Sequence, residues 1–550
     1  MRKLSLYVIG AAILFNSCNT TAESNETGEP QERAYQLTIE SDQTFQTEEF
    51  DKDSVKIVGY DKINGRVLFV DGKEDGLTIL SHEEEKWEKV KTITFEKGEV
   101  NSVAVYENLA AVAVTDSSKT KDGQVYFVDP GKGAILGSVT VGPLPDMVAF
   151  TPDGKYLLSA NEGEPSKKYN SDPEGTVSII ELNRQDLSNS KVTNLGFDES
   201  LITTGPSGEF PRTHSYLENF LDEYSVARDI EPEYLAIDGN SRFAYVVCQE
   251  NNSIAKIDIE KKEVLNLKSL GYKDFSQSGI DIIKDGSAQI IPQPVYGMYM
   301  PDAITTFEIN GKTYLATANE GDDRGDWEDK TDFEDQDICK AKKLTEDFGI
   351  ILDSRFLDDE GKILDEYKNL RVSPHDCIDS NGDGAIDILT IFGGRSFSIW
   401  DEDLNLIYDS GSLFEEYTAQ YAAGYFNCND NNLVMDDRST KKGPEPESIT
   451  YGEVDGVPML FVALECFGGF FAFDVSTPSS PKMLLYHSDR NFKAKVDKDF
   501  KYTDESYGNT GDLGPEGLIF IPAEESLSGQ DQLIVGNQVS GTLRMYNLSM

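Results

Sequence analysis

Basic residues are scarce in this chain. Its 550 residues include 50 Lys and Arg against 98 Asp and Glu, which gives a formal net charge of −48 at pH 7. A charge of this sign repels nucleic acids and anionic lipid surfaces, and it attracts cations and cationic surfaces. The composition therefore argues against nucleic acid and predicts cations or a cationic surface as partners. In the alternative interpretation, the acidity only keeps an exported protein in solution.

Histidine is rarer still, and the common catalytic motifs are absent. The four histidines, His82, His214, His375 and His487, fall at unrelated points of the chain. The sequence contains no G-x-S-x-G nucleophile elbow, no H-E-x-x-H zinc motif and no phosphate-binding loop. A mechanism driven by histidine is not expected, whereas hydrolysis assisted by bound metal ions stays open.

Long apolar runs are absent except at the N-terminus. There Arg2 and Lys3 precede an apolar run that ends in Phe15-Asn16-Ser17-Cys18. This pattern predicts a lipoprotein signal peptide over residues 1–17 and a lipid on Cys18, with a conventional signal peptide cut elsewhere as the alternative. Residues 18–33, rich in Ser, Thr, Asn and Glu, are typical of a flexible tether. We expect an exported protein anchored by lipid to a membrane of the cell envelope, facing the periplasm or the outside.

Cysteine is also scarce. Besides Cys18 there are five, an odd number that cannot pair completely within one chain. Cys339 and Cys377 are the candidate disulfide pair, because they lie in one predicted insertion. Cys248 and Cys466 are expected to pack as small apolar residues.

The chain does contain a repeat. Five times a proline and an acidic residue open an alternating apolar run, and a second run then ends in a polar pair or an acidic residue. The openings are Pro145-Asp146, Pro232-Glu233, Pro301-Asp302, Pro446-Glu447 and Pro515-Glu516. The closings are Asn161-Glu162, Gln249-Glu250, Asn319-Glu320, Glu465 and Asn537-Gln538.

Each repeat predicts a small antiparallel sheet. The copy at Pro145 reads as three strands with a turn at Pro152-Asp153-Gly154, and a fourth strand is expected. Two weaker copies without the Pro-acid opening lie upstream, between Val55 and Asp129. Because such units must stack to bury their apolar faces, residues 34–550 are predicted to form an all-β, seven-bladed β-propeller of four-stranded blades.

Two features interrupt or close this repeat. The stretch Tyr35–Glu40 alternates well enough to be the outer strand of the last blade, which would lock the ring; a disordered linker is the alternative. Two large insertions are expected at about residues 186–229 and 322–388, where loops can carry functional variation.

The second insertion ends in a candidate calcium loop. Asp379, Asn381, Asp383 and Asp387 occupy positions 1, 3, 5 and 9, with Gly384 at position 6 and the carbonyl group of Ala385 at position 7. Several oxygen ligands around a glycine turn suit a hard cation. Position 12 is Thr390, so the loop is not an EF-hand. Calcium is the predicted cofactor; a solvated turn is the alternative.

The repeated acids form a second candidate site. In a propeller the first strands line the central channel, so Asp146, Glu233, Asp302, Glu447 and Glu516 are expected to ring one mouth of it. Glu162, Glu250, Glu320 and Glu465 are expected close by, at the ends of second strands. Such carboxylates need cations, protons or arginines between them, and Arg395 and Arg438 are candidate countercharges. In the alternative, each Pro-acid pair only caps its strand.

Six segments carry a family resemblance. LPDMVAFTPDGKYLLSANEGEP, DIEPEYLAID, MPDAITTFEINGKTYLATANEGD, LTIFGGRSFSIWD, KKGPEPESITYGEVDG and GDLGPEGLIFIPAEESLSG resemble the choice-of-anchor I domain family from about residue 50 to the end. The resemblance implies a secreted, propeller-like protein held at the surface by an anchor. The family is similar to mesenchyme-specific cell-surface glycoproteins, and some bacterial members are labelled alkaline phosphatases.

Two functions therefore stay open. The first is a lipid-anchored, calcium-binding propeller that engages a ligand or partner without chemistry. The second is a calcium-dependent phosphoesterase, alkaline phosphatase-like or phytase-like, that binds a phosphate-containing ligand at the acidic mouth. No catalytic residue can be named from the sequence, so the first is favoured.

Overall fold

The repeat that opens at Pro145, the third along the chain, shows how the sequence forms one sheet. Strands β10 (Pro145–Phe150), β11 (Tyr156–Asn161), β12 (Thr176–Glu181) and β13 (Lys191–Leu195) form an antiparallel sheet in chain order. The predicted turn between the first two is present, and Gly154 takes a φ of 64° that favours glycine. Leu157 and Leu158 of β11 are fully buried on opposite faces, because neighbouring sheets cover both sides of the strand.

The computed structural model describes residues 36–47, 50–83, 86–96, 98–166, 169–215, 224–324, 337–506 and 508–550. Residues 1–17, Cys18 and the tether 18–33 lie outside them, so signal peptide, lipid anchor and tether stay predictions. Residues Gln36–Met550 form one unit. None of the helices in the described ranges has the length and apolar character that crossing a membrane requires.

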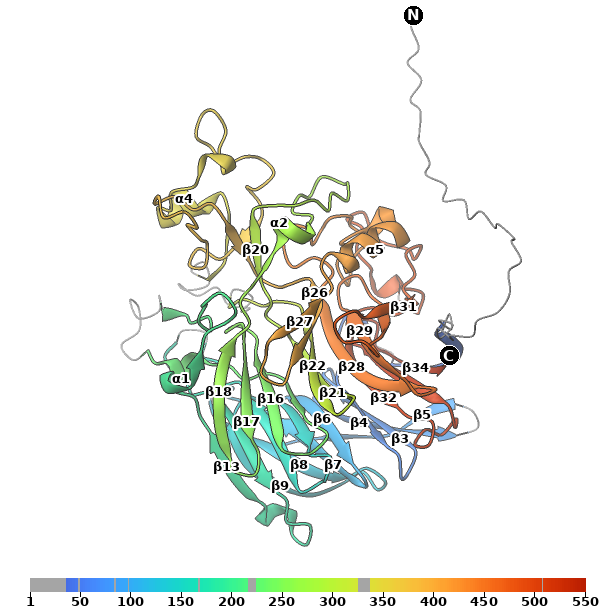
Figure 1. Cartoon of the computed structure of the whole chain (residues 1–550). Helices are drawn as coiled ribbons and strands as arrows, with labels where there is room; N and C mark the ends of the chain where they lie inside the picture. The colour runs from blue at the N-terminus through green and yellow to red at the C-terminus, as the bar shows by residue number, and fades with distance from the viewer. Residues whose placement is uncertain are drawn as a thin grey trace, which may run out of the picture. The chain divides into compact units, whose positions relative to one another are not determined.

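Seven such sheets follow one another along the chain (Figure 1). The first two are β2 (Val58–Asp61), β3 (Arg66–Asp71), β4 (Gly76–Glu83), β5 (Lys86–Thr94), and β6 (Val100–Tyr106), β7 (Leu109–Val114), β8 (Asp122–Asp129), β9 (Ala134–Pro143). After the β10–β13 sheet come β15 (Leu235–Ile237), β16 (Phe243–Cys248), β17 (Ser253–Asp258), β18 (Glu263–Ser269), with β14 (Ile202–Thr203) parallel to β18. The fifth sheet is β21 (Ala303–Ile309), β22 (Lys312–Asn319), β26 (Ser396–Asp401), β27 (Leu406–Asp409). The sixth is β28 (Pro446–Val454), β29 (Val457–Leu464), β30 (Phe470–Asp474), β31 (Lys482–His487).

The seventh sheet joins the two ends of the described chain. β32 (Pro515–Ile521), β33 (Asp531–Asn537) and β34 (Thr542–Ser549) are completed by β1 (Thr38–Gln46), which runs antiparallel to β34. The predicted lock is thus confirmed from Thr38 onward. Each first strand contacts the next, in the order β2, β6, β10, β15, β21, β28 and β32, and β32 contacts β2. This closed ring is a β-propeller, and it is consistent with the seven predicted blades.

The remaining elements lie in the connections. Two small sheets are formed by β19 (Tyr272–Asp274), β20 (Val295–Met298) and β25 (Leu389–Ile391), and by β23 (Cys339–Lys340) and β24 (Arg371–Val372). The helices are α1 (Val226–Asp229), α2 (Phe275–Ser278), α4 (Lys343–Phe348) and α5 (Leu413–Tyr421). The 3₁₀ turns are η1 (Leu187–Asn189), η2 (Glu199–Leu201), η4 (Ser354–Phe356), η5 (Ala423–Tyr425) and η6 (Asp504–Ser506).

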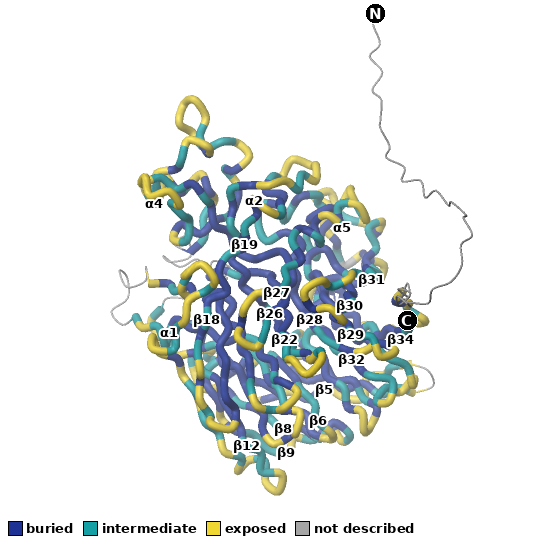
Figure 2. The backbone as a smooth tube through the Cα atoms, viewed as in Figure 1, coloured by how far each residue is buried: buried dark blue, intermediate teal, exposed yellow. Residues whose placement is uncertain are grey.

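The two predicted insertions differ in outcome. The first insertion was predicted at residues 186–229, but Lys191–Leu195 within that range is the fourth strand of its sheet. The first insertion therefore begins after Leu195. The second insertion, between β22 and β26, has a core of its own that includes Leu344, Phe356 and Leu370 and packs on Phe275 of α2. Figure 2 shows buried strands between exposed turns. The insertion is thus held against α2 by apolar contacts, and each fully buried apolar side chain contributes about 1.5–3 kcal/mol.

The cysteines pack as follows. Cys248 and Cys466 are buried, as expected of small apolar residues. Cys339 and Cys377 lie in one apolar cluster, and the thiol of Cys377 donates to the Ser373 carbonyl oxygen at 3.1 Å. Cys377 is a free thiol in the structure, so the predicted disulfide with Cys339 is not formed.

Candidate functional site

One position of the repeat recurs at the start of the first strand of each of the seven propeller sheets. It is occupied by Lys56, Asn101, Asp146, Glu233, Asp302, Glu447 and Glu516, which we call the ring residues. The backbone identifies the two that lack a Pro-acid opening. Lys56 N–H donates to Val70 O at 3.0 Å, as Glu233 N–H donates to Val247 O at 3.0 Å. Asn101 lies at a break in register between Val100 and Ser102, as Asp146 lies between Pro145 and Met147.

These breaks in register explain why the acids gather. In the sheets that begin at Pro145, Pro446 and Pro515, the acidic residue falls where the first strand carries an extra, unpaired residue. Such bulges re-aim a side chain away from the ladder. Six of the ring residues line one cavity of about 100 Å³, and Glu233 lines a larger one of about 750 Å³. The predicted ring of five acids is thus brought together.

The ring is charged and poorly compensated. None of its five carboxylates accepts a hydrogen bond from a residue that the structure describes, so the strand-capping bonds of the alternative interpretation are not seen. Lys56 lies 3.7 Å from Glu516, and the pKa of Lys56 is raised mainly by that carboxylate. Burial raises the pKa of Asp146 to about 6 despite Lys56 nearby. Burial, then the neighbouring acids, raise the pKa values of Glu233 and Asp302 well above the usual range.

A second layer of acids lies at the ends of the second strands. It includes the predicted Glu162, Glu250, Glu320 and Glu465. Beside this layer lie two acids that sequence reasoning missed, Glu231 and Glu445, each two residues before a ring residue. Both missed residues directly precede a repeat proline, in the doubled pattern Glu-Pro-Glu. The acid on both sides of the proline is the sequence feature that could have indicated these two residues. Together with ring residues, these acids form three groups whose ligand atoms lie within 4.8 Å of one another.

The first group is Glu162, Glu231 and Glu250, in the cavity of about 750 Å³. Glu231 pairs with Arg324 at 2.7 Å. Glu250 is 7% exposed, and its Oε2 atom has no hydrogen-bond partner. Burial, then Asp322, raise the pKa of Glu250 to about 8. A buried, unpartnered carboxylate oxygen costs free energy unless a proton or cation meets it.

The second group is Asp302, Glu320 and Glu447. Glu320 accepts hydrogen bonds from Gln249 at 3.0 Å and from Lys442 at 2.8 Å, and burial raises its pKa to about 7 despite Lys442. Glu447 is 8% exposed, and its Oε2 atom has no hydrogen-bond partner. This group repeats the arrangement of the first.

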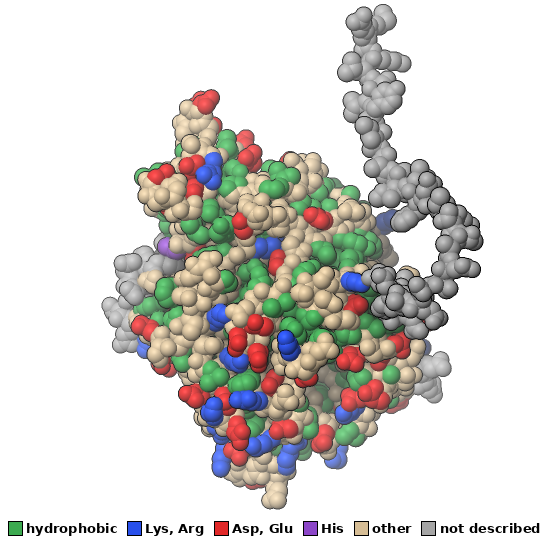
Figure 3. All heavy atoms as spheres, in the orientation of Figure 1, with side chains coloured by type: hydrophobic (Ala, Val, Ile, Leu, Met, Phe, Trp, Pro, Cys, Tyr) green, Lys and Arg blue, Asp and Glu red, His purple; other side chains and the backbone are tan. Residues whose placement is uncertain are grey.

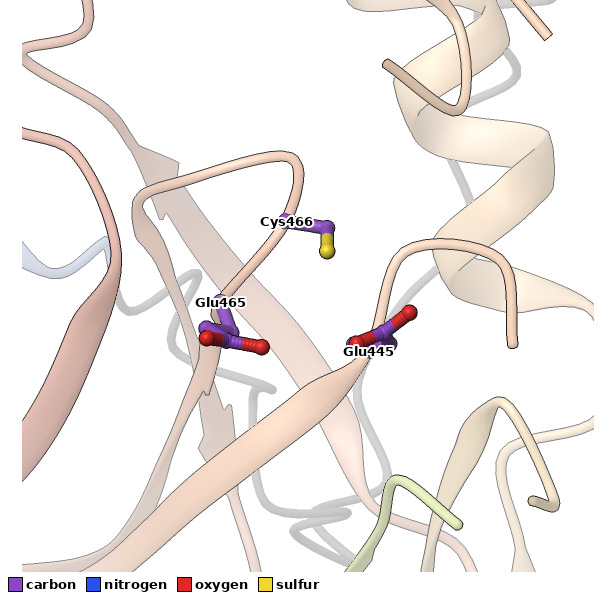
Figure 4. A group of neighbouring side chains, drawn as sticks. All are labelled: Glu445, Glu465 and Cys466. Carbon is purple, nitrogen blue, oxygen red and sulfur yellow. The ribbon is translucent and has the colours of Figure 1, made fainter. Parts of the chain in front are cut away.

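The third group consists of Glu445, Glu465 and Cys466, whose side chains are drawn in Figure 4. Two basic side chains of the protein already contact this group. Arg438 is ion-paired with Glu445, and Lys442 lies 3.7 Å from it. Burial opposes ionisation of Glu445, but Arg438 and Lys442 lower its pKa to about 2. Burial, then Glu445, raise the pKa of the Cys466 thiol. A neutral thiol beside a compensated carboxylate makes a poor metal ligand, so the first two groups are the better cation sites.

The two predicted countercharges lie apart from the ring acids. Arg438 forms an ion pair with Glu445, which is not a ring residue. Arg395 is 1% exposed and pairs with Glu415 at 2.8 Å, and it also donates to the carbonyl oxygens of Asp281 and Ser439. Arg395 therefore ties connecting segments together, and Lys56 is the basic residue of the ring.

The predicted calcium loop forms an exposed turn near the end of the second insertion. Asp379 accepts backbone hydrogen bonds from Gly382 and Gly384, both at 2.8 Å, and Asp383 accepts one from Ala385 at 2.9 Å. Asp387 instead accepts two hydrogen bonds from Ser380, and these bonds lower its pKa. Asn381 and Asp383 are exposed. Calcium binding by this loop stays a prediction.

A buried ionic network holds Arg324 at the first group. Asp229 pairs with Arg324 at 3.0 Å and with His214 at 2.8 Å. Arg212 pairs with Asp337 and, at 2.8 Å, with Asp376 of the second insertion. Burial, then Arg324, lower the pKa of His214. The network joins the segment before α1 to the second insertion at the cavity wall.

The arrangement suits hard cations. Six carboxylates in two groups of three supply the oxygen ligands that calcium prefers, and neighbouring backbone and water oxygens can complete a shell of six to eight. On the face drawn in Figure 3, acidic and basic side chains are interspersed over the sheets. The uncompensated acids of the mouth thus differ from that surface.

Comparisons with known proteins place the chain in a family. It is 26% identical over 292 residues to a mesenchyme-specific cell surface glycoprotein of Strongylocentrotus purpuratus; the match covers 47% of this chain and 36% of that protein. A streptogramin B lyase structure aligns over 94% of this chain and 98% of its own, with 8% identity and a TM-score of 0.43. Sqt1 of Saccharomyces cerevisiae aligns over 92% and 98%, with 10% identity and a TM-score of 0.39. A model of the choice-of-anchor I domain matches residues 56–478, which is most of the chain, and the protein therefore belongs to the choice-of-anchor I domain family.

Proposed function

We propose that this protein is a surface-associated β-propeller that binds calcium at its acidic mouth and there engages a ligand or partner. The observation that carries the proposal is the pair of buried, unpartnered carboxylate oxygens, Oε2 of Glu250 and Oε2 of Glu447, each within a group of three carboxylates. Such atoms are tolerated when a cation binds them.

Surface association is supported by the family and by its relative, which is named as a cell surface glycoprotein. We further propose that a lipid on Cys18 holds the propeller at the cell envelope, as the sequence before residue 34 predicts. The loop from Asp379 to Asp387 is proposed as a second, separate calcium site.

A calorimetric titration tests the mouth. Chelator-treated protein is titrated with calcium chloride, and the Glu250→Gln and Glu447→Gln variants are titrated in the same way. We expect each variant to bind at its group about tenfold more weakly, because the number of charged ligands sets calcium affinity. Glu308→Gln, an exposed change on β21, is the matched control. Unchanged calcium binding in both mouth variants would count against the proposal.

A calcium-dependent phosphoesterase is the second candidate function. It is favoured by Arg324 and Lys119, which line the same cavity as Glu162, Glu231 and Glu250. A phosphate ester on a cation held there would meet positive charge, which stabilises the transition state of phosphoryl transfer. Turnover of an aryl phosphate in calcium, abolished by chelator, would support this function; tight calcium binding without turnover would leave the binding role.

A further inference from the structure

A small basic pocket lies beside the acidic mouth. It has a volume of about 160 Å³ and is lined by Asp323, Ile338, Arg371, Phe392, Arg438, Lys441 and Lys442. Four basic side chains around one small cavity stand out in a chain of net charge −48. The pocket joins two connections of the propeller: Arg371 lies on β24 of the second insertion, and the other three lie between α5 and β28.

The backbone holds these two connections together. The N–H group of Arg371 donates to the carbonyl oxygen of Thr440 at 2.9 Å, next to Lys441. Buried Arg395 donates to the carbonyl oxygens of Ser439 and Lys441, at 2.9 and 2.7 Å. The positive groups of Arg371 and Lys441 are therefore kept close by bonds that do not use either side chain.

Two of the four cations are satisfied within the protein. Arg438 is paired with Glu445, and Lys442 with Glu320 at 2.8 Å. The other two are not: neither the guanidinium group of Arg371 nor the ammonium group of Lys441 makes a hydrogen bond or ion pair with any residue in the described ranges. The Nε atom of Arg438 is buried and also lacks a hydrogen-bond partner. The pKa of Lys441 is lowered by burial and then by Arg438 and Arg371, so the positive groups of the pocket repel one another.

We infer that this pocket binds a tetrahedral oxyanion, the phosphate or sulfate group of a ligand. Arginine offers paired N–H donors that match two oxygens of such a group, and lysine adds a point charge. The cavity volume of about 160 Å³ is several times that needed to hold one water molecule, so a tetrahedral oxyanion has room to enter. The site is distinct from the cation groups, because its free donors belong to Arg371 and Lys441.

Titration of the full chain with inorganic phosphate, and separately with sulfate, tests the inference. Chelator is present throughout, so that failure of the calcium proposal does not affect the result. We expect binding of at least one anion, weakened about tenfold or more by Arg371→Ala and by Lys441→Ala, because each removes charged hydrogen bonds. Arg371→Lys should restore part of the loss. Lys498→Ala, which removes the same charge at a side chain 89% exposed, should have no effect.

The melting temperature without anion confirms that each variant folds. Binding of phosphate alone assigns the pocket to phosphate groups, and binding of sulfate alone assigns it to sulfate groups. No binding of either anion, or binding that both alanine variants retain in full, would overturn the inference.

Discussion

The ammonium group of Lys56 lies 3.7 Å from a carboxylate oxygen of Glu516, and this ion pair joins the first sheet of the ring to the last. Lys56 occupies the position that carries an acid in five of the other sheets. It therefore compensates part of the negative charge of the ring at the place where the propeller closes. The remaining acids still need protons or cations.

Replacing Lys56 with methionine removes this compensation. We expect Lys56→Met to lower the free energy of unfolding of the metal-free protein by about 1 kcal/mol at pH 8, since the pair is partly exposed. The loss should be smaller at pH 5, where Asp146, whose pKa is raised to about 6, and Glu233 and Asp302, whose pKa values are raised further, carry protons. Denaturant unfolding at the two pH values measures both. Lys62→Met, which breaks an exposed pair with Glu525, is the control and should change stability less. Equal losses at both pH values would contradict this role.

The raised pKa values of the mouth predict how stability depends on pH. Asp146, Glu320 and Glu250 titrate in the folded protein near 6, 7 and 8, above the values of carboxyl groups in an unfolded chain. The folded state thus holds these protons more tightly. Their contribution to stability is complete below about pH 4 and is lost as the pH rises through the raised values.

Thermal melts between pH 5 and pH 8 check this dependence. In chelator, the melting temperature should fall from pH 5 to pH 8. Added calcium should reverse most of this decrease at pH 8. Glu250→Gln should flatten the fall, because the amide has no proton to lose. A melting temperature in chelator that rises with pH over this range would contradict the prediction.

The loop of the second insertion predicts a separate effect. We expect calcium to raise the melting temperature in part through this loop, and Asp383→Ala to abolish that part, because the change removes one of the proposed oxygen ligands. The calcium stoichiometry should fall by one site while binding at the mouth persists. Asp359→Ala, which removes an exposed carboxylate elsewhere in the second insertion, is the matched control and should leave the stoichiometry unchanged. An unchanged stoichiometry in Asp383→Ala would leave the loop as a solvated turn.

The repeat predicted most of the fold and much of the mouth. A proline followed by an acidic residue indicates where a first strand begins, and the alternation of apolar and polar residues indicates the strands that follow. Both are local patterns, so the sheets and the closing strand from Thr38 could be predicted from the sequence. Lys56 and Asn101 could not be placed in the ring, because their copies lack the proline and only the backbone register equates them with Asp146 and Glu233.

The pairing of charges was harder to predict than the gathering of acids. Arg395 was expected near the ring, yet it pairs with Glu415, because the folding of the connections decides which charges meet. The basic pocket depends on hydrogen bonds between segments distant in sequence, such as the backbone bond between Arg371 and Thr440. No local pattern reports such a contact.

The most direct test of the calcium proposal is anomalous diffraction from crystals soaked in manganese, a cation that also prefers oxygen ligands. We predict an anomalous peak within bonding distance of Glu162, Glu231 and Glu250, and a second between Asp302, Glu320 and Glu447. Peaks confined to the loop at Asp379, or no peak at either group of the mouth, would contradict the proposal that these acids hold a cation.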